Sequence, residues 1–211
     1  MRMVEEQLRH PRGDRRRPVR DERVLRAMEE VPREEFVPAG WQKSAFEDRA
    51  LPIGPEQTIS QPYMVGIMTE LLGAEPGDVV LEVGTGSGYQ AAVLASLVRK
   101  VWSVESVEHL AREAGQRLAR LGFANVHVLH GDGRRGWPEH GPYDGIIVTA
   151  AGEGVPRALL EQLKPGGRMV IPLRVGGDQQ ELMVIERRED GGYEQKRIMP
   201  VRFVPLTDER E

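Results

Sequence analysis

Residues 79–89, VVLEVGTGSGY, join an apolar run to a loop with glycine at every second position. The run has the length and composition of a buried strand, and the apolar residues after the loop favour a helix over residues 89–98. Glycines at such a turn let the backbone approach a ligand closely, and the first turn of the helix offers free N–H groups. The stretch predicts a strand–loop–helix unit that binds a nucleotide-like ligand, although a tight turn without a ligand has the same pattern.

The details of the loop separate the candidate ligands. A dinucleotide-binding loop needs Gly-x-Gly-x-x-Gly or Ala, and Tyr89 stands where the last small residue is required. Glu82 lies inside the apolar run, two residues before Gly84, and a charge there is costly unless it has a partner. A ligand with a positively charged amino group supplies that partner, whereas a pyrophosphate is repelled. We therefore expect a ligand with amino-acid character and place Glu82 beside it.

Two further acids follow runs that are predicted to be neighbouring strands. Glu105 ends the run 100–105, where doubly wound sheets place an acid that accepts hydrogen bonds from ribose hydroxyls. Asp132, in His130-Gly-Asp-Gly133, can accept a hydrogen bond from an adenine amino group. An amino acid, a ribose and an adenine at one edge of a sheet together describe S-adenosylmethionine. Taken singly, Glu105 also fits a charge at a solvent-exposed strand end.

The chain beyond residue 79 alternates between strand-like and helix-like segments. Strands are expected at 79–83, 100–105, 126–129 and 143–148, and helices at 89–98, 108–121 and 156–163. This alternation implies right-handed crossovers and a parallel sheet covered on both faces. After Lys164-Pro-Gly-Gly167, strand-like runs at 168–173, 181–188 and 193–199 predict an antiparallel hairpin at the sheet edge. The expected fold class is α/β, a Rossmann-like doubly wound methyltransferase sheet that is mostly parallel, with a C-terminal antiparallel edge and a small N-terminal helical region.

The N-terminal quarter is less regular. A short helix is expected to start at Asp21 and to end before Pro32, because the residue before a proline is disfavoured in a helix. The prolines that follow predict irregular structure up to residue 55. The expected organisation is an N-terminal helical or irregular region, 1–55, packed on a methyltransferase domain, 56–211, in one compact unit.

Composition excludes several classes of function. The net charge of -4 over 211 residues argues against general nucleic-acid binding, although seven arginines in the first 20 residues leave an RNA-binding arm as an alternative to a solvated terminus. The absence of cysteine and of any His-x-x-x-His pair predicts no metal site. There is no apolar run long enough for a membrane span or a signal peptide, so we expect a cytoplasmic protein that does not bind membranes.

Small polar residues precede a helical pattern in the segment 57–72. Apolar residues at i, i+3, i+4, i+7 and i+8 from Met64 predict a helix that Gly73 ends. Pro62 suits the first helical position, which makes Gln61 the capping residue and leaves Ser60 just outside the helix. Ser60 is then either a cap displaced by one residue or part of the ligand site.

The sequence resembles the protein-L-isoaspartate O-methyltransferases, a family of S-adenosylmethionine-dependent enzymes that repair damaged aspartyl and asparaginyl residues. The similarity runs from Val31-Pro-Arg-Glu-Glu-Phe-Val-Pro38 to Arg202-Phe-Val-Pro-Leu206. Its most specific part is Ala50-Leu-Pro-Ile-Gly54 with Gln57-Thr-Ile-Ser-Gln-Pro62. Further matches are Leu81-Glu-Val-Gly-Thr-Gly-Ser-Gly-Tyr89, Gly131-Asp-Gly133 and Tyr143-Asp-Gly-Ile-Ile-Val-Thr-Ala-Ala151. The glycine loop alone indicates a methyltransferase, and the segment around Ser60 indicates this family.

The resemblance implies methyl transfer from S-adenosylmethionine to the free α-carboxylate of L-isoaspartyl residues, with S-adenosylhomocysteine as the product. Isoaspartyl proteins and peptides are the implied partners, and we expect a monomer that binds no nucleic acid. Ser60 is the implied catalytic residue. The residues expected at the cofactor are Gln57, Thr58, Ile59, Ser60, Glu82, Gly84, Thr85, Gly86, Ser87, Glu105, Ser106, Asp132, Gly133 and Thr207.

Two departures from the family pattern leave loop conformations open. Glu56 stands where glycine is usual, and Gly152-Glu-Gly154 replaces a more apolar stretch. The alternatives are a methyltransferase that acts on a small molecule or RNA, which the segment 57–62 disfavours, and a binding module without catalysis, which the three acids disfavour. A nicotinamide dehydrogenase is disfavoured by Tyr89.

Overall fold

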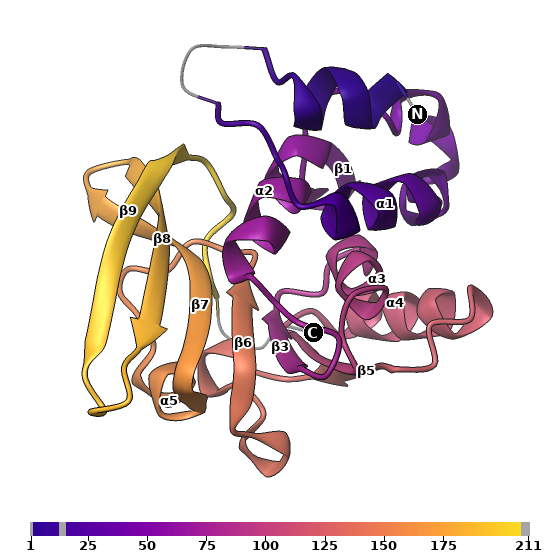
Figure 1. Cartoon of the computed structure of the whole chain (residues 1–211). Coiled ribbons are helices and arrows are strands. Elements are labelled where there is room, and N and C mark those ends of the chain that lie inside the picture. The colour runs from indigo at the N-terminus through magenta and orange to yellow at the C-terminus, as the bar shows by residue number, and fades with distance from the viewer. Residues whose placement is uncertain (1, 13–15, 208–211) are drawn as a thin grey trace.

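A seven-stranded sheet with the strand order β5-β4-β3-β6-β7-β8-β9 forms the centre of the protein (Figure 1). The computed structural model describes residues 2–12 and 16–207. The strands are β3 Val79–Val83, β4 Lys100–Glu105, β5 Val126–His130, β6 Tyr143–Val148, β7 Leu163–Gly176, β8 Gln179–Arg187 and β9 Tyr193–Val201. Pairings from β5 through β7 are parallel, and β8 and β9 pair antiparallel. The expected fold class is confirmed.

The strand order reverses at β3. From β3 the chain passes through α3, Tyr89–Ala95, to β4, then through α4, Glu108–Arg120, to β5. It then crosses back to β6 on the other side of β3 and continues through α5, Arg157–Glu161, to β7. Open α/β sheets bind ligands outside the carboxyl ends of the strands at such a switch point. The topology alone therefore places the site beside the glycine loop.

The strand β7 is longer than expected because Lys164-Pro-Gly-Gly167 does not interrupt it. Tyr143 pairs with Leu163 and Gly145 with Arg168, so the intervening residues of β7 bulge outward. Gly166 has φ of 76°, a conformation that glycine adopts readily. Residues 164–167 therefore form a bulge within one strand.

The segment before α2 was expected to be irregular, and this prediction is wrong in part. Leu51–Gly54 (β1) and Gln57–Ile59 (β2) form an antiparallel hairpin. Glu56 lies in the turn of this hairpin and has φ of 57°, the only positive value for a non-glycine residue in the described part of the chain. A side chain is disfavoured there, which gives a physical reason for the glycine that is usual at this position in the family.

The helix α2, Pro62–Leu72, has the predicted ends. Pro62 is its first residue, Gln61 occupies the N-cap position without a side-chain capping hydrogen bond, and Gly73 ends it in the left-handed conformation with φ of 65°. Ser60 thus lies one residue before the cap. Every residue from Pro62 to Thr69 is buried, because α2 packs between β6 and β7 on one side and the N-terminal helices on the other.

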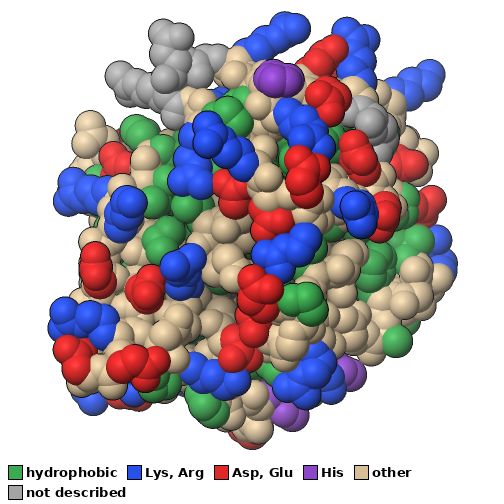
Figure 2. Space-filling model, viewed as in Figure 1, with side chains coloured by type: hydrophobic (Ala, Val, Ile, Leu, Met, Phe, Trp, Pro, Cys, Tyr) green, Lys and Arg blue, Asp and Glu red, His purple; other side chains and the backbone are tan. Residues whose placement is uncertain are grey.

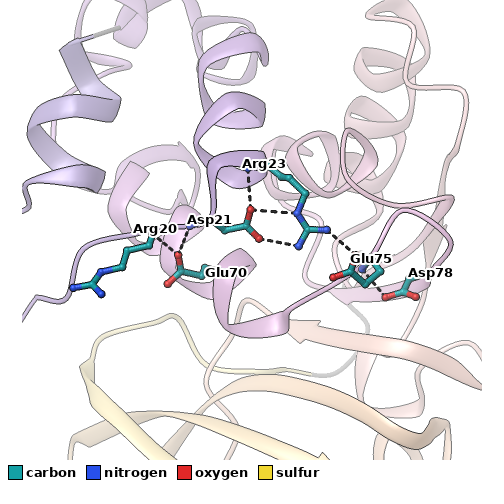
Figure 3. A network of polar contacts seen from close by, with 6 residues as sticks. All are labelled: Arg20, Asp21, Arg23, Glu70, Glu75 and Asp78. Carbon is teal, nitrogen blue, oxygen red and sulfur yellow. Dashed lines mark hydrogen bonds and ion pairs between the residues drawn. The ribbon is translucent and has the colours of Figure 1, made fainter.

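Hydrogen bonds and ion pairs of charged side chains join the N-terminal region to α2 (Figure 3). It contains the short helix Val4–Arg9, α1 Glu22–Glu30 and the 3₁₀ helices Arg33–Phe36 and Ala39–Ser44. The carboxylate of Glu70 accepts hydrogen bonds from the backbone N–H groups of Arg20 and Asp21 and from the Arg17 side chain. Further along, Arg23 bridges Asp21 and Glu75.

Arg16 and Arg17, the described members of the run Arg15–Arg17, contact the body of the protein. Arg16 contacts Asp48 and lies over the Tyr63 ring at 4.9 Å, and the Tyr63 hydroxyl donates to the carbonyl of Arg17 at 3.1 Å. Arg15 lies outside the described residues. The contacts of Arg16 and Arg17 favour a structural role for these two residues over an RNA-binding arm. Basic and acidic side chains are also interspersed over the described part of the face in Figure 2, without a separate basic surface.

The expected boundary between residues 55 and 56 falls inside the β1–β2 hairpin, and the division into two regions stays a prediction. One apolar core joins the N-terminal helices, α2 and α3 to one face of the sheet, and a second covers the other face. The edge strand β9 exposes residues 193–197. Within 2–12 and 16–207, every helix is too short or too polar to cross a bilayer.

Candidate functional site

A cavity opens at the carboxyl ends of β3 and β4, at the switch point of the sheet. The residues that line it are Val65, Tyr89, Gln90, Gly133 and the segments 57–60, 83–87, 104–106, 149–150 and 204–207. The segment 204–207 is held there by hydrogen bonds to Ala151, whose N–H donates to Val204 at 2.8 Å and whose carbonyl accepts from Leu206 at 2.8 Å. All the predicted site residues except Glu82 and Asp132 lie in this lining.

The glycines of the loop have different neighbours. A Cβ atom on Gly84 would lie 2.3 Å from the Thr149 hydroxyl oxygen, which itself donates to the Gly84 carbonyl at 2.6 Å. At Gly86, with φ of 54°, the nearest atom to such a Cβ would be the end of the Ile53 side chain at 3.4 Å. Gly84 is therefore required by its packing against Thr149, the residue after β6, whereas Gly86 gives the backbone its approach to the cavity.

Glu105 holds this loop in place. It is 5% exposed, one carboxylate oxygen accepts from Gly86 N–H at 2.7 Å, and the other accepts from Val107 N–H at 3.1 Å. Each carboxylate oxygen can accept a further hydrogen bond. Because Glu105 also lines the cavity, the same side chain can fix the loop and receive hydroxyl groups of a ligand.

Glu82 does not reach the cavity, contrary to the sequence-based expectation. Successive side chains of a strand point to opposite faces. Val83 lines the cavity, so Glu82 points to the other face of the sheet, which is also covered by core, and it is 0% exposed. Its carboxyl accepts a hydrogen bond from Ser103, whose oxygen lies 2.6 Å from that of Thr85 in the loop. Burial raises the pKa of Glu82 to about 8. Neutralisation by a proton, and not by a ligand's amino group, lowers the cost of this buried acid.

Asp132 is also outside the lining. Its carboxylate accepts from the backbone N–H of Arg134 at 3.0 Å and from the Arg134 guanidinium at 2.9 Å, which caps the 3₁₀ helix Gly133–Arg135. The hydrogen bond from Arg134 holds the pKa of Asp132 below its usual value. The Asp132 carboxylate thus faces a neighbouring residue of its own segment. Of residues 130–133, Gly133 lines the cavity.

A second hollow of about 250 Å³ adjoins the first. Thr58, Ser60, Thr149 and Val204 belong to both linings, and Ala50, Gln61, Met64, Arg202 and Phe203 complete the second. The sequence-based prediction gave no role to Thr149, although it directly follows β6 at the carboxyl end of that strand, close to the level at which Glu105 ends β4. A search for acids at strand ends selects Glu105 and passes over Thr149, whereas a search for any polar residue there would have found both.

The residues that line the first cavity fit S-adenosylmethionine. Glu105 is suited to ribose hydroxyls, and Ile59, Val104 and Leu206 offer apolar surface. Neither lysine nor arginine is among the described residues of this lining, so a phosphate group would lack a cationic partner, whereas a sulfonium is compatible with the acid. No group of three or more metal-ligating side chains occurs in the part of the chain that the structure describes. Fold and site define the class of S-adenosylmethionine-dependent methyltransferases.

Comparison with known proteins identifies the family within this class. The family model of protein-L-isoaspartate(D-aspartate) O-methyltransferase matches residues 6–211, and the chain belongs to this family. Protein-L-isoaspartate O-methyltransferase 2 of Polaromonas sp. is 53% identical over 203 residues, 96% of each chain. The corresponding protein of Gloeobacter violaceus is 50% identical over 208 residues, 99% of this chain and 98% of its own.

Solved structures agree with this assignment. A protein-L-isoaspartate O-methyltransferase superposes with a TM-score of 0.81 at 32% identity, over 90% of this chain and 62% of its own. A member from Plasmodium falciparum, in complex with S-adenosyl-L-homocysteine, superposes with a TM-score of 0.78 at 25% identity, over 89% of this chain and 91% of its own.

The buried acid predicts a specific dependence of stability on pH. Between its usual pKa of 4.5 and the folded value of about 8, Glu82 keeps a proton that the unfolded chain has released. Stability therefore falls as the pH rises through this window and stays low above it. Glu82→Gln should remove this decline and gain several kcal/mol over the natural protein at pH 9, since each pKa unit corresponds to about 1.4 kcal/mol. Urea denaturation at pH 5, 7 and 9 measures the difference, and parallel curves would contradict it.

Loss of Glu105 should weaken cofactor binding. Glu105→Ala removes the acceptor of Gly86 N–H and the acceptor that we expect for ribose, so affinity for S-adenosylhomocysteine should fall by about 1.5–3 kcal/mol, the usual value of a hydrogen bond to a charged group. Glu105→Gln keeps one acceptor oxygen and should lose less. Calorimetric titration measures both, with exposed Glu108→Ala as the control. Unchanged affinity in the alanine variant would remove Glu105 from the site.

Proposed function

We propose that this protein transfers a methyl group from S-adenosylmethionine to the free α-carboxylate of L-isoaspartyl residues in damaged proteins, which begins their repair. The observation that carries the proposal is the position of Ser60. It lies in the wall common to the two hollows, where a methyl donor in one meets an acceptor that enters from the other. The names of the relatives and the family match support the same acceptor.

The cofactor would be held by the loop and by Glu105. Glu105 would receive the ribose hydroxyls, Gly86 would allow close approach of the backbone, and Ile59 and Leu206 would supply apolar contacts. When bound, S-adenosylmethionine supplies a methyl group already activated by its positively charged sulfur.

The acceptor requires little chemistry from the protein. A carboxylate is ionised at neutral pH, so no general base has to remove a proton. The described residues of the two linings include no histidine or lysine, which agrees with this requirement. The contribution of the protein is then to hold the acceptor in line, and such positioning is worth about 7–11 kcal/mol in favourable cases. The Ser60 hydroxyl, as a hydrogen-bond donor, can orient a carboxylate without protonating it.

The second hollow fits an anionic acceptor. Arg202 is the one charged side chain among its described lining residues, and it is exposed. An acceptor RNA is less favoured, because the N-terminal arginines at positions 16 and 17 are engaged within the protein. We also propose, from the sequence, that the protein works as a monomer in the cytoplasm and binds neither nucleic acid nor membranes.

Two peptides that differ in one linkage test the proposed function. Methyl transfer from labelled S-adenosylmethionine should occur with a peptide that contains L-isoaspartate and not with the same peptide that contains normal aspartate. The label should be lost on mild alkaline treatment, as expected for a methyl ester. Equal transfer to both peptides, or to neither, would overturn the proposed acceptor.

Ser60→Ala separates orientation of the acceptor from helix capping. Gln61 occupies the cap position of α2, so the variant should keep its melting temperature. Turnover of the isoaspartyl peptide should fall about ten-fold or more, which corresponds to roughly 1.4 kcal/mol of activation free energy. Ser96→Ala, at the end of α3 and outside both linings, is the matched control. A destabilised Ser60→Ala protein with full turnover would show that Ser60 has only a structural role.

A further inference from the structure

Arg33 is a charged side chain at the base of the site. It starts the 3₁₀ helix Arg33–Phe36 and is 0% exposed. Its Nε donates to the carbonyl of Ala45 at 2.7 Å, and one terminal nitrogen, Nη2, donates to the carbonyl of Ser60 at 2.7 Å. The other, Nη1, is buried without a hydrogen-bond partner. The guanidinium lies over the Tyr89 ring at 4.7 Å.

Stability alone does not account for this residue. A buried charge is costly, and the cost is usually offset by an opposite charge. No ion pair joins Arg33 to a carboxylate among the described residues; two backbone carbonyls and an aromatic face are its partners. An apolar side chain of similar volume would avoid the desolvation cost. A function for the guanidinium is the simpler explanation.

The contacts of Arg33 connect the two sides of the reaction site. Ser60 follows β2 and lines both hollows, whereas Tyr89 is the first residue of α3, directly after the glycine loop. The Tyr89 ring is itself fixed, with an edge-on contact to Phe36 at 5.5 Å and 1% exposure. One planar group therefore sets the distance between the backbone at Ser60 and the start of α3.

We propose that Arg33 is a positioning residue for methyl transfer, which fixes the backbone at Ser60 relative to the glycine loop. This inference rests on the proposed function. A hydroxyl that orients an acceptor works only if its own backbone is fixed, and a displacement of about 1 Å at a reaction site can cost about a hundred-fold in rate. Arginine suits this task because its planar group donates in several fixed directions, which lysine cannot reproduce.

The chain offers a matched control in Arg187 on β8. Its guanidinium also donates to a backbone carbonyl, that of Leu163 at 2.6 Å, lies over a tyrosine ring, that of Tyr193 at 6.0 Å, and has a buried nitrogen without a hydrogen-bond partner. Arg187 lies in neither lining. Its loss removes the same kinds of contact at a distance from the reaction site.

The test compares Arg33→Lys, Arg33→Met and Arg187→Met. Turnover of the isoaspartyl peptide is measured below the melting temperature of each variant. Both Arg33 variants should lose about ten-fold or more in kcat, with lysine the milder change, because it can donate to one of the two carbonyls. Affinity for S-adenosylhomocysteine should stay within about three-fold, since Glu105 and Thr149 still hold the loop. Arg187→Met should keep kcat whatever its stability.

A double variant distinguishes positioning from general structural support. If Arg33 acts through Ser60, then Arg33→Lys should change kcat by less than about three-fold in a Ser60→Ala background, because the two losses are not independent. Independent, multiplied losses would overturn the inference. So would folded Arg33 variants with unchanged kcat, or a failure of both to fold while Arg187→Met folds. A natural protein that methylates no isoaspartyl peptide would instead overturn the proposed function.

Discussion

The hydrogen bond from Gly86 N–H to the Glu105 carboxylate, at 2.7 Å, determines where the ligand site lies. It joins the loop after β3 to the end of β4, and Gly84 N–H adds a second link to the Val104 carbonyl at 2.8 Å. On the other side, Thr149 after β6 donates its N–H to Val83 at 2.9 Å. The loop is therefore held by both neighbours of β3, and its conformation follows from the parallel order of the three strands.

The N-terminal region extends this arrangement to the acceptor side. It contributes β1, which pairs with the strand β2 directly before Ser60, and it contributes the buried Arg33. Its own position depends on Glu70, which is 13% exposed at the side chain and accepts two backbone N–H groups besides the Arg17 guanidinium. Charged contacts thus hold the region in place on α2, whereas apolar packing of α1, α2 and α3 supplies the larger part of the buried surface.

Much of this could be predicted from the sequence, and the failures have physical causes. Apolar runs predicted β3, β4 and β6, because these strands are buried, and Pro62 and Gly73 predicted the ends of α2. The β1–β2 hairpin was missed because prolines and a strained Glu56 conceal a short pairing. The position of Glu82 along the chain does not reveal that its side chain points to the face of β3 opposite to the cavity, where it is buried. Asp132 is engaged by its neighbour Arg134, and its contact with the cofactor stays a prediction. Arg33 lay within a family motif, but its contacts are with residues 12 and 27 positions away, which no local pattern indicates.

The exposed edge of the sheet bears on the substrates that such an enzyme meets. The start of β9 presents Glu194, Gln195, Lys196 and Arg197 to solvent, and Pro200 near its end cannot donate to a further strand. An open sheet edge can pair with an exposed segment of an unfolded chain. A charged edge interrupted by proline disfavours such pairing, so the protein can encounter misfolded chains without becoming a template for their aggregation.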